Sequence, residues 1–545
     1  MDHQLSSVAN KSKSRSFLGV RKELIIRLTP LTIVAISAIL EFLFISSNSI
    51  AGDEPFSIYH SQMRISSIID LCMNGNNPPL HFIMLHYWIK LFGISPLSVR
   101  FLSVVFSVTT VYFVYRIGKD FFSYQTGVLS SLLFSFSNLN LLLSHEARVY
   151  TLFGLLATLS MFFFLSIRKN KNRYFYIFLL ITNTLLVYSH YLGIFVIMVQ
   201  TIAVLLIKDI RKPLFKYYMI YLLLFSCFFI PNIILLLNRF SGTPVGTWLD
   251  QPNGIISIYD MLWTFSNKPV TTVFCLLILV AALVKYFISV YKKTRVCKKK
   301  TSSLRLAKQQ KAEFTGVNEH FCCKRNEKIG VFLQTLITKQ KTGNVTNNKI
   351  ILLWFLFPFF TMFFVSYWLP MFLDRYLYFV SIGYYFTLAI AISFIFQSDK
   401  FNYLFSGIFL ILFIVTFNPK MDNKRHAEET VAKVTELKDQ NTSVIICPSF
   451  FMLNFAYYYN KDFFCEADNG NLYQKLTKRL NDDKVYPINS ADLIQYSTKR
   501  IVFLDAAANF SFPDNNIYNT LKERYKLKNE YKFYEKFIVS VFEDQ

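Results

Sequence analysis

Long apolar runs separated by short polar segments fill the chain between residues 24 and 418. A helix needs about 20 mostly apolar residues to cross a bilayer. The runs that approach this length are Leu24–Ser46, Val99–Ile117, Thr126–Leu143, Tyr150–Ile167, Phe175–Ser189, Leu192–Ile207, Tyr217–Leu237, Val270–Tyr291, Ile350–Trp368, Tyr376–Phe396 and Phe401–Thr416. The pattern predicts a polytopic α-helical membrane protein with about eleven spans. Two runs leave the count open, because Phe175–Ser189 is short and Pro79–Leu91 suits the membrane interface as well as a span.

The polar stretches divide the chain into parts. A basic tail (1–23) precedes a membrane region (24–418), which contains a first loop (48–98) and a Lys- and Gln-rich insertion (292–349). The insertion shows little periodicity, so we expect it to be flexible or only partly helical. One helical stretch and three β-like runs in the last part (419–545) predict a small α/β domain. They are Lys424–Asp439, Ser443–Cys447, Arg500–Leu504 and Phe537–Phe542.

Lys and Arg collect in alternate connections. They are dense in the tail, after the second, fourth and sixth predicted spans, and in the insertion, whereas the other connections contain few. Because basic residues stay on the cytoplasmic side, the tail and the insertion are predicted to be cytoplasmic. The first loop and the C-terminal domain are then extracytoplasmic. The first apolar run is too long for the core of a signal peptide and is expected to remain as a span.

Composition agrees with this topology. Hydrophobic residues make up 53% of the 545 residues, which is far too apolar for a soluble protein. The excess of 58 Lys and Arg over 34 Asp and Glu is explained by topology and by contact with anionic lipids, so nucleic acid is not an expected partner. The eight cysteines show no metal-binding spacing. Only Cys447 and Cys465 share the outer C-terminal domain, where a disulfide is allowed but not implied.

An acidic pair, Asp53-Glu54, opens the first loop directly after the first span. Asp53 can cap the next helix, with Glu54-Pro55 in its first turn. A functional interpretation is that one carboxylate takes a proton from an acceptor hydroxyl, while its neighbour or a divalent cation manages phosphate charge. The two interpretations are compatible. Asp53 lies nearer the membrane edge, where desolvation is expected to raise its pKa and make it the better base.

Further along the first loop, Asn77 precedes a Pro-Pro turn and an apolar helical stretch that carries His81 and His86. Such a stretch suits a helix that lies in the headgroup layer. We interpret His86 as an interfacial polar residue. His81 lies beside the turn, on the same outer face as Asp53, and is a candidate for substrate binding.

Three later span ends bring polar groups to the same outer face. SHEARVY contains Glu146 and Arg148. They pair with each other or cap the next helix in one interpretation, and serve as a second acidic group and a phosphate ligand in the other. YSHYLG places His190 and Tyr191 at a similar depth. In LPMFLDRYLYF, Arg375 and Tyr376 begin a late span, and Arg375 is either an anchor paired with Asp374 or a ligand for a lipid phosphate. This convergence is more informative than any one motif.

Taken in order, these motifs resemble a large bacterial family of polyprenyl-phosphate-dependent glycosyltransferases. The family is related to protein O-mannosyltransferases and the lipid A aminoarabinose transferase, and it has the GT-C fold. The resemblance covers residues 24–418 and depends on GDEPFS, NPPLHFIMLHYWIKLFG with SVRFLSVVFS, SHEARVY, YSHYLG and DRYLYF. The chain has Asn77 where the family frequently has His before Pro-Pro.

The resemblance implies an enzyme that moves a sugar from a polyprenyl-phosphate-linked donor to a lipid, glycan or protein acceptor, with inversion at the anomeric carbon. It matches the family's acidic residue to Asp53, with Glu54 beside it. Some members hold a divalent metal, for which Asp53 and Glu146 are the candidates here. It also favours a bacterial inner membrane. Neither a Gly-rich phosphate loop nor a dinucleotide fingerprint occurs, so no nucleotide cofactor is expected.

Other protein classes predict different features. A transporter or flippase of a lipid-linked saccharide predicts charges deep within spans and internal duplication. The sequence shows charges chiefly at span ends and no duplicated half. A sensor or scaffold leaves the first loop without a purpose. Polysaccharide polymerases and ligases lie close to the glycosyltransferase interpretation.

Overall fold

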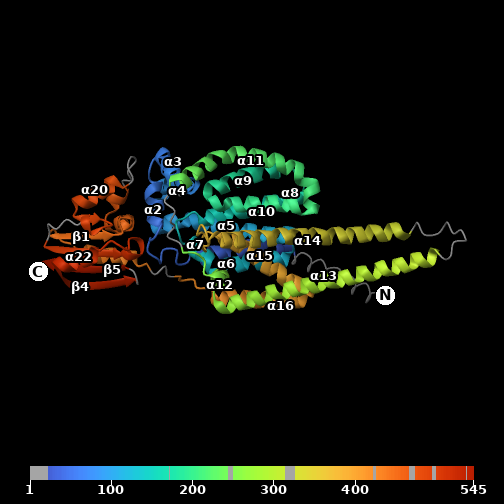
Figure 1. Ribbon diagram of the computed structural model, residues 1–545. Coiled ribbons are helices and arrows are strands. Elements are labelled where there is room, and N and C mark those ends of the chain that lie inside the picture. The colour runs from blue at the N-terminus through green and yellow to red at the C-terminus, as the bar shows by residue number, and fades with distance from the viewer. Residues whose placement is uncertain are drawn as a thin grey trace, which may run out of the picture.

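The computed structural model describes residues 23–75, 77–170, 172–242, 250–312, 326–421, 425–465, 473–493, 499–534 and 537–544. Most of the basic tail therefore lies outside the described residues. A long helical bundle occupies the centre of the molecule, and a domain that contains the β-sheet lies at one end of it (Figure 1). The helices α2 (Glu54–Ser61), α3 (Ile65–Asn74) and α4 (Leu80–Phe92) lie between the two.

The bundle confirms a multi-pass membrane fold. Its elements after α4 are α5 (Pro96–Phe121), α6 (Tyr124–Ser135), α7 (Asn138–Ser144), α8 (Tyr150–Asn170), α9 (Tyr174–Ser189), η1 (Tyr191–Gly193), α10 (Ile194–Leu206), α11 (Lys208–Gly242), α12 (Gly254–Phe265), α13 (Pro269–Ala312), α14 (Asn326–Val365), α15 (Tyr378–Ile395) and α16 (Asp399–Thr416). Within the described chain, eight helices, including Glu23–Phe42, are long and apolar enough to cross a membrane.

The difference from eleven predicted spans has a geometric cause. The predicted span Thr126–Leu143 is the pair α6 and α7, which meet at a bend of 59° and make a ninth span if counted together. The predicted spans Phe175–Ser189 and Leu192–Ile207 are the short helices α9 and α10, of 16 and 13 residues. An apolar run in the sequence does not reveal where a helix bends or stops. The run Pro79–Leu91 corresponds to α4, which has 13 residues.

The bend between α6 and α7 is stabilised by a side chain from a distant segment. Ser137 caps α7 by accepting a hydrogen bond from the Asn140 amide. Asn267 accepts from the Asn138 backbone N–H at 2.8 Å and donates to the Phe136 carbonyl at 2.8 Å. In a membrane every backbone polar group must find a partner inside the protein. Asn267 supplies partners at the break in the helix.

The described parts of the insertion 292–349, which we expected to be flexible or only partly helical, are helical. Residues up to Ala312 continue α13, and residues from Asn326 belong to α14, so the two helices project together from the bundle (Figure 1). Lys, Arg, Gln and Leu are good helix formers, and a helix already nucleated in the membrane extends at little cost.

The C-terminal part is a small α/β domain, as predicted. It contains α17 (Ala427–Leu437), β1 (Thr442–Cys447), η2 (Ser449–Phe451), α18 (Met452–Tyr459), α19 (Lys461–Cys465), α20 (Gln474–Asp482), β2 (Val485–Pro487), η3 (Ala491–Leu493), β3 (Arg500–Ala506), α21 (Ala508–Ser511), α22 (Ile517–Arg524), β4 (Tyr525–Tyr534) and β5 (Phe537–Asp544). The strand order is β2-β1-β3-β5-β4, parallel from β2 to β3 and antiparallel from β3 to β4.

The inner strand β1 is buried along its whole length, as its uninterrupted apolar run predicts. Cys447 at its end is a buried free thiol, and Cys465 is free and exposed. The allowed disulfide between them is therefore not formed.

Candidate active site

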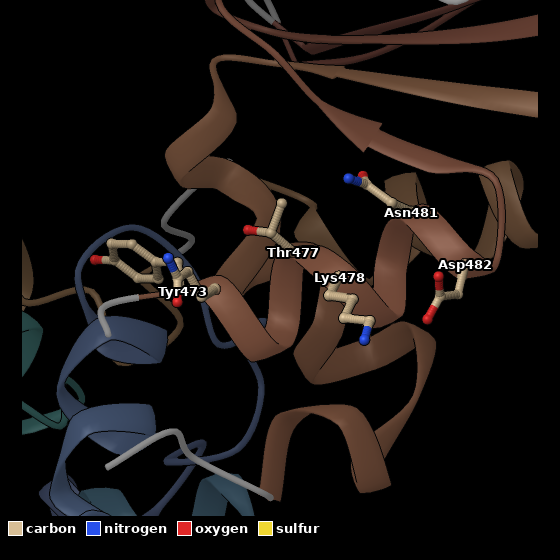
Figure 2. A pocket seen from close by; sticks show the side chains of 6 residues that line it. Tyr473, Thr477, Lys478, Asn481 and Asp482 are labelled. Atoms are coloured by element: carbon tan, nitrogen blue, oxygen red, sulfur yellow. The ribbon is translucent and has the colours of Figure 1, made fainter. Parts of the chain in front are cut away.

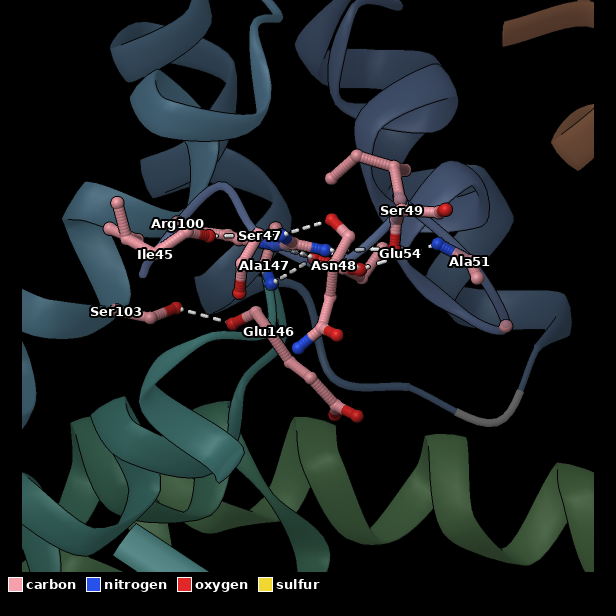
Figure 3. Close-up of polar contacts among 12 residues, drawn as sticks. Ile45, Ser47, Asn48, Ser49, Ala51, Glu54, Arg100, Ser103, Glu146 and Ala147 are labelled. Atoms are coloured by element: carbon pink, nitrogen blue, oxygen red, sulfur yellow. Dashed lines mark hydrogen bonds and ion pairs between the residues drawn. The ribbon is translucent and has the colours of Figure 1, made fainter. Parts of the chain in front are cut away.

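Glu54 and Arg100 form a buried ion pair where the first loop meets α5. The guanidinium donates from Nε to Oε1 at 2.8 Å and from Nη2 to Oε2 at 2.7 Å. Both side chains are almost completely inaccessible to solvent. Glu54 also accepts a hydrogen bond from the Ala147 amide at 2.9 Å, which attaches the loop before α8 to the same pair (Figure 3).

Arg100 completes this arrangement with three backbone carbonyls. It donates to Ile45, Asn48 and Ser49 at 2.9 to 3.1 Å. A buried pair whose donors and acceptors are satisfied in this way fixes geometry. Glu54 therefore holds the loop in place, which differs from the catalytic role predicted for it. We name Glu54 and Arg100 the clamp.

Asp53, one residue earlier, points to a different set of partners. Its Oδ2 lies 3.7 Å from Nη2 of Arg148 and 3.5 Å from Nη1 of Arg375. Its side chain is 52% exposed, so this carboxylate is accessible to a substrate while its neighbour is not. Asp53 is the N-cap residue of α2, but its side chain makes no capping hydrogen bond. The helix-cap interpretation of the side chain is therefore wrong.

The electrostatic environment of Asp53 also differs from our expectation. The Arg148 guanidinium, assisted by those of Arg375 and Arg425, holds the pKa of Asp53 below its usual value, although burial acts in the opposite direction. Desolvation was expected to raise this pKa. Two ion pairs outweigh it, because an opposite charge within about 4–6 Å favours the ionised form.

Arg148 and Glu146 do not pair with each other as one interpretation allowed. Arg148 donates to Ser57 Oγ at 2.7 Å and faces Asp53. Its Nε is buried and has no hydrogen-bond partner among the described residues. The Glu146 side chain points away from the clamp (Figure 3), and burial together with the charge of Glu54 raises its pKa to about 7.

The Arg375 guanidinium faces Asp53 and packs against two tyrosine rings. Its guanidinium carbon lies 5.9 Å from the ring centroids of Tyr150 and Tyr376, which is within the range of a cation–π interaction. Arg148 lies 6.0 Å from the same Tyr150 ring. Asp374 accepts a hydrogen bond from the Arg375 backbone amide, while the Arg375 guanidinium turns to Asp53. The anchor interpretation through Asp374 is therefore wrong for the guanidinium.

His190, at the end of α9, packs against the same group of aromatic rings. Its ring stacks on Phe153 at a centroid distance of 4.8 Å and meets Tyr376 edge-on at 5.4 Å. Tyr191 follows as the first residue of η1 and is half-buried. We name Asp53, Arg148 and Arg375, with the rings of Tyr150, Tyr376 and His190, the outer cluster. Residues from four separate span ends meet there, as the topology predicted.

The remaining candidates lie around α4. His81 is buried, and burial together with the nearby positive charge of Arg148 lowers its pKa to about 3, so it is neutral. His86 bonds through Nδ1 to the Ser61 carbonyl at 2.8 Å and is buried inside the protein, whereas we interpreted it as an interfacial residue. Asn77 lies in the turn before α4, and no hydrogen bond joins it to the described residues of the outer cluster.

Sequence reasoning missed a carboxylate inside the first span. Glu41 is 1% exposed, and its Oε1 accepts hydrogen bonds from Ser37 and Asn140. Its backbone carbonyl accepts from His145 Nε2 at 2.7 Å, next to Glu146. An ionisable residue within an apolar run is the signal for Glu41, as it is for Arg100.

The described side chains do not form a metal site. No group of three His, Cys, Asp or Glu residues with suitable geometry occurs among them, and Asp53 already faces two guanidiniums. A divalent cation is disfavoured beside such positive charge. The metal predicted at Asp53 and Glu146 therefore takes no part in the mechanism proposed below.

One open hollow of about 470 Å³ lies elsewhere, on the C-terminal domain. Figure 2 shows its lining along α20. The Tyr473 ring at its edge contacts the ring of His60 in α2 at a centroid distance of 5.7 Å. None of the predicted site residues lines this hollow.

Comparison with known proteins places this geometry in a family context. Residues 76–235 match the family described as dolichyl-phosphate-mannose-protein mannosyltransferase. The crystal structure of ArnT from Cupriavidus metallidurans bound to undecaprenyl phosphate matches with a TM-score of 0.52 and 8% identity, over 94% of this chain and 97% of ArnT. The chain has the GT-C fold. Over residues 76–235 the GT-C chain is thus similar to the protein O-mannosyltransferases, in agreement with the resemblance found in its motifs.

Another solved structure similar to the GT-C chain is the oligosaccharyltransferase of Archaeoglobus fulgidus, tethered to an acceptor peptide. It matches with a TM-score of 0.45 and 11% identity, over 94% of this chain and 74% of that one. A search of curated protein sequences finds no match. The match over residues 76–235 and the GT-C fold point to a glycosyltransferase.

Proposed function

We propose that the protein transfers a sugar from a polyprenyl-phosphate-linked donor to a hydroxyl of a lipid, glycan or protein, at the extracytoplasmic face of a bacterial inner membrane. The observation that carries this proposal is the accessible carboxylate of Asp53 between the guanidiniums of Arg148 and Arg375. ArnT, which has the same fold, is described with undecaprenyl phosphate bound.

The donor's phosphate is expected to bind the two guanidiniums. Arg148 offers an Nε–H that has no acceptor among the described residues, and buried donors of this kind call for a partner. Guanidinium groups match phosphate oxygens in pairs. When the bond between the anomeric carbon and the phosphate oxygen breaks, the leaving phosphate gains negative charge, and these fixed cations stabilise it.

Asp53 is the proposed base. The acceptor oxygen attacks the anomeric carbon from the side opposite the phosphate, so the anomeric centre inverts, and Asp53 takes the hydroxyl proton. In the free protein its low pKa makes it a weak base. A bound phosphate competes for Arg148 and Arg375, so the pKa of Asp53 rises towards the value that burial favours. Binding of the donor therefore makes Asp53 a stronger base.

The transporter interpretation gains no support from the buried charges. Glu41 and Arg100 lie near the ends of their spans, and the half-buried Lys285, which lies farther inside its span, donates to the carbonyls of Phe394 and Ile395. A translocation path predicts charges deep in the bilayer instead.

A transfer assay with Asp53→Asn tests the proposed reaction. Purified protein in lipid nanodiscs receives a labelled polyprenyl-phosphate sugar and acceptors extracted from the host, and the labelled product is measured. We expect about 10²–10⁴-fold less transfer with the variant and normal accumulation in the membrane. Asp70→Asn is the matched control, because Asp70 is an exposed carboxylate of the same loop. Full activity of Asp53→Asn would exclude Asp53 as the base.

The donor sugar and the acceptor are to be identified in the host. Lipid and glycan profiling of a deletion strain is expected to show one missing sugar on one class of acceptor, with its lipid-linked donor accumulated. Unchanged glycans together with a lipid-linked saccharide trapped on the cytoplasmic side would favour a flippase instead.

A further inference from the structure

The first loop is attached along its length to the segment after the last span. Asn48 donates to the Met421 carbonyl at 2.6 Å, and the Tyr458 hydroxyl donates to the Ile50 carbonyl at 3.2 Å. Asn454 of α18 donates to the Gly52 carbonyl at 3.4 Å. These contacts bring the C-terminal domain to the residue that precedes Asp53.

At Gly52, the guanidinium of Arg425 occupies the position that a Cβ atom would take in any other residue. Gly52 has φ +62°, and a Cβ atom built on it would lie 1.5 Å from Nη1 and 2.6 Å from Cζ of Arg425. Arg425 therefore packs directly on the backbone beside Asp53. Only glycine combines the positive φ with the space that Arg425 fills.

The charge of Arg425 reaches both carboxylates of the site. Arg425 lowers the pKa of Asp53, as Arg148 and Arg375 do more strongly. It also opposes the rise in the pKa of Glu146 that burial and Glu54 cause. Three guanidiniums thus act on two carboxylates, which leaves a surplus of one positive charge when both are ionised.

That surplus matches a reaction that releases a phosphate monoester. A sugar phosphodiester carries one negative charge, whereas a free monoester carries about 1.5 to 2 at neutral pH. A positive surplus therefore stabilises the leaving phosphate more than the intact donor, which is the condition for accelerating the bond-breaking step.

We propose that Arg425 is a third phosphate-binding guanidinium, so that the C-terminal domain completes the site for a prenyl phosphate monoester. This inference depends on the proposed function, because it assigns a ligand of the same site. Arg425 acts together with Arg148 and Arg375, and the first loop carries glycine at position 52 to admit it.

Binding of undecaprenyl phosphate to the full-length protein in phosphatidylcholine nanodiscs tests the proposal. We expect Arg425→Gln to weaken binding about tenfold or more, and Arg425→Lys to restore part of it, because a charge-assisted contact is lost and then partly replaced. The matched control is Lys420→Gln, an exposed cation of the same segment that lies over the Phe44 ring. Its binding is expected to stay within twofold of the wild type.

Two further ligands separate the phosphate group from the lipid chain. Phosphatidic acid and inorganic phosphate are tested as competitors, and each is expected to displace undecaprenyl phosphate from the wild type more effectively than from Arg425→Gln. Equal binding of undecaprenyl phosphate by the wild type and Arg425→Gln would overturn the proposal, even if inorganic phosphate alone bound less well to the variant.

The same measurements distinguish this inference from the proposed function. A wild-type protein that binds undecaprenyl phosphate and transfers sugar, together with an Arg425→Gln variant that matches it in both, would refute only the role of Arg425. A wild-type protein that binds no undecaprenyl phosphate and transfers no sugar would refute both.

Discussion

Asp53 and Glu54 are neighbours in the chain and opposites in environment. Glu54 is enclosed and accepts two hydrogen bonds from Arg100, whereas Asp53 is half-exposed and faces two guanidiniums at longer distances. The short, saturated pair fixes the loop, and the longer contacts leave room for a substrate to exchange partners. The comparison teaches that a carboxylate–guanidinium pair can be structural or reactive, and that burial and saturation separate the two.

The largest effect is expected from breaking the clamp. Arg100→Gln leaves the Glu54 carboxylate buried without its partner charge, which costs about 3–5 kcal/mol of stability. Thermal unfolding in detergent and the amount of protein in the membrane measure this. Arg116→Gln is the control, since Arg116 lies on the same helix in a partly exposed pair with Asp120 and should cost under about 1 kcal/mol. Equal losses for the two variants would refute the clamp.

Breaking the outer cluster should spare the fold and affect the donor. Arg375→Ala removes one guanidinium that faces Asp53, and the expected result is an apparent KM for the donor raised about 10- to 100-fold, with little change in stability. Initial transfer rates over a range of donor concentrations measure it. Arg173→Ala, an exposed arginine before α9, should leave KM unchanged. An unchanged KM for Arg375→Ala would identify Arg375 as an anchor only.

Glu146 has no arginine at contact distance, so its titration can be compared with that of Asp53 and Glu54, which both face arginines. Its pKa is raised to about 7 in the folded protein, from a reference value of 4.5. The stability that this causes is complete below about pH 4.5 and is lost as the pH rises through about 7. Glu146→Gln does not titrate, so its unfolding temperature should gain on the wild type between pH 5 and pH 8.

The matched control for this pH series is Glu436→Gln, which changes an exposed carboxylate on α17. Its unfolding temperature is expected to follow that of the wild type at every pH. A constant difference between Glu146→Gln and the wild type from pH 5 to pH 8 would show that Glu146 does not titrate in this range.

The smallest effect is expected at Glu41, a buried carboxyl group that bonds to neutral partners. Glu41→Gln keeps an acceptor for Ser37 and Asn140 and should change stability by less than about 1 kcal/mol, whereas Glu41→Ala leaves buried donors unpaired and should cost about 1–3 kcal/mol. The unfolding temperatures of Glu41→Gln and Glu41→Ala, compared with the wild type, measure this difference. Equal effects of the two would show that the charge, not the hydrogen bonds, matters at this position.

The sequence was sufficient to predict the membrane class and the approach of Asp53, Arg148 and Arg375. Apolar runs locate the spans, and alternating topology brings every second span end to the same face. The direction of each side chain was not predictable, because Glu54 turns inward only where the packing of α5 places Arg100. The pKa of Asp53 depends on the same three-dimensional neighbours, which explains why desolvation alone predicted the wrong direction.

The C-terminal domain shows the same limit. The apolar runs of β1, β3 and β5 were visible, whereas β2 has only three residues and β4 is rich in Lys and Tyr. The lysines of β4 suit an edge strand more than a core strand. Arg425 carries no local signal at all. Its role follows only from its place against Gly52, a residue that lies far away in the chain.

The attachment of the first loop to the C-terminal domain also sets an order of events during synthesis. Asn48 bonds to Met421, which is 373 residues later in the chain. At 5–20 residues per second, the ribosome makes Met421 about 20–75 s after Asn48. Until then the nascent protein has inserted its spans but lacks the contacts that fix the residues around Asp53. The residues around Asp53 can therefore reach their final positions only after the ribosome has delivered the segment beyond the last span.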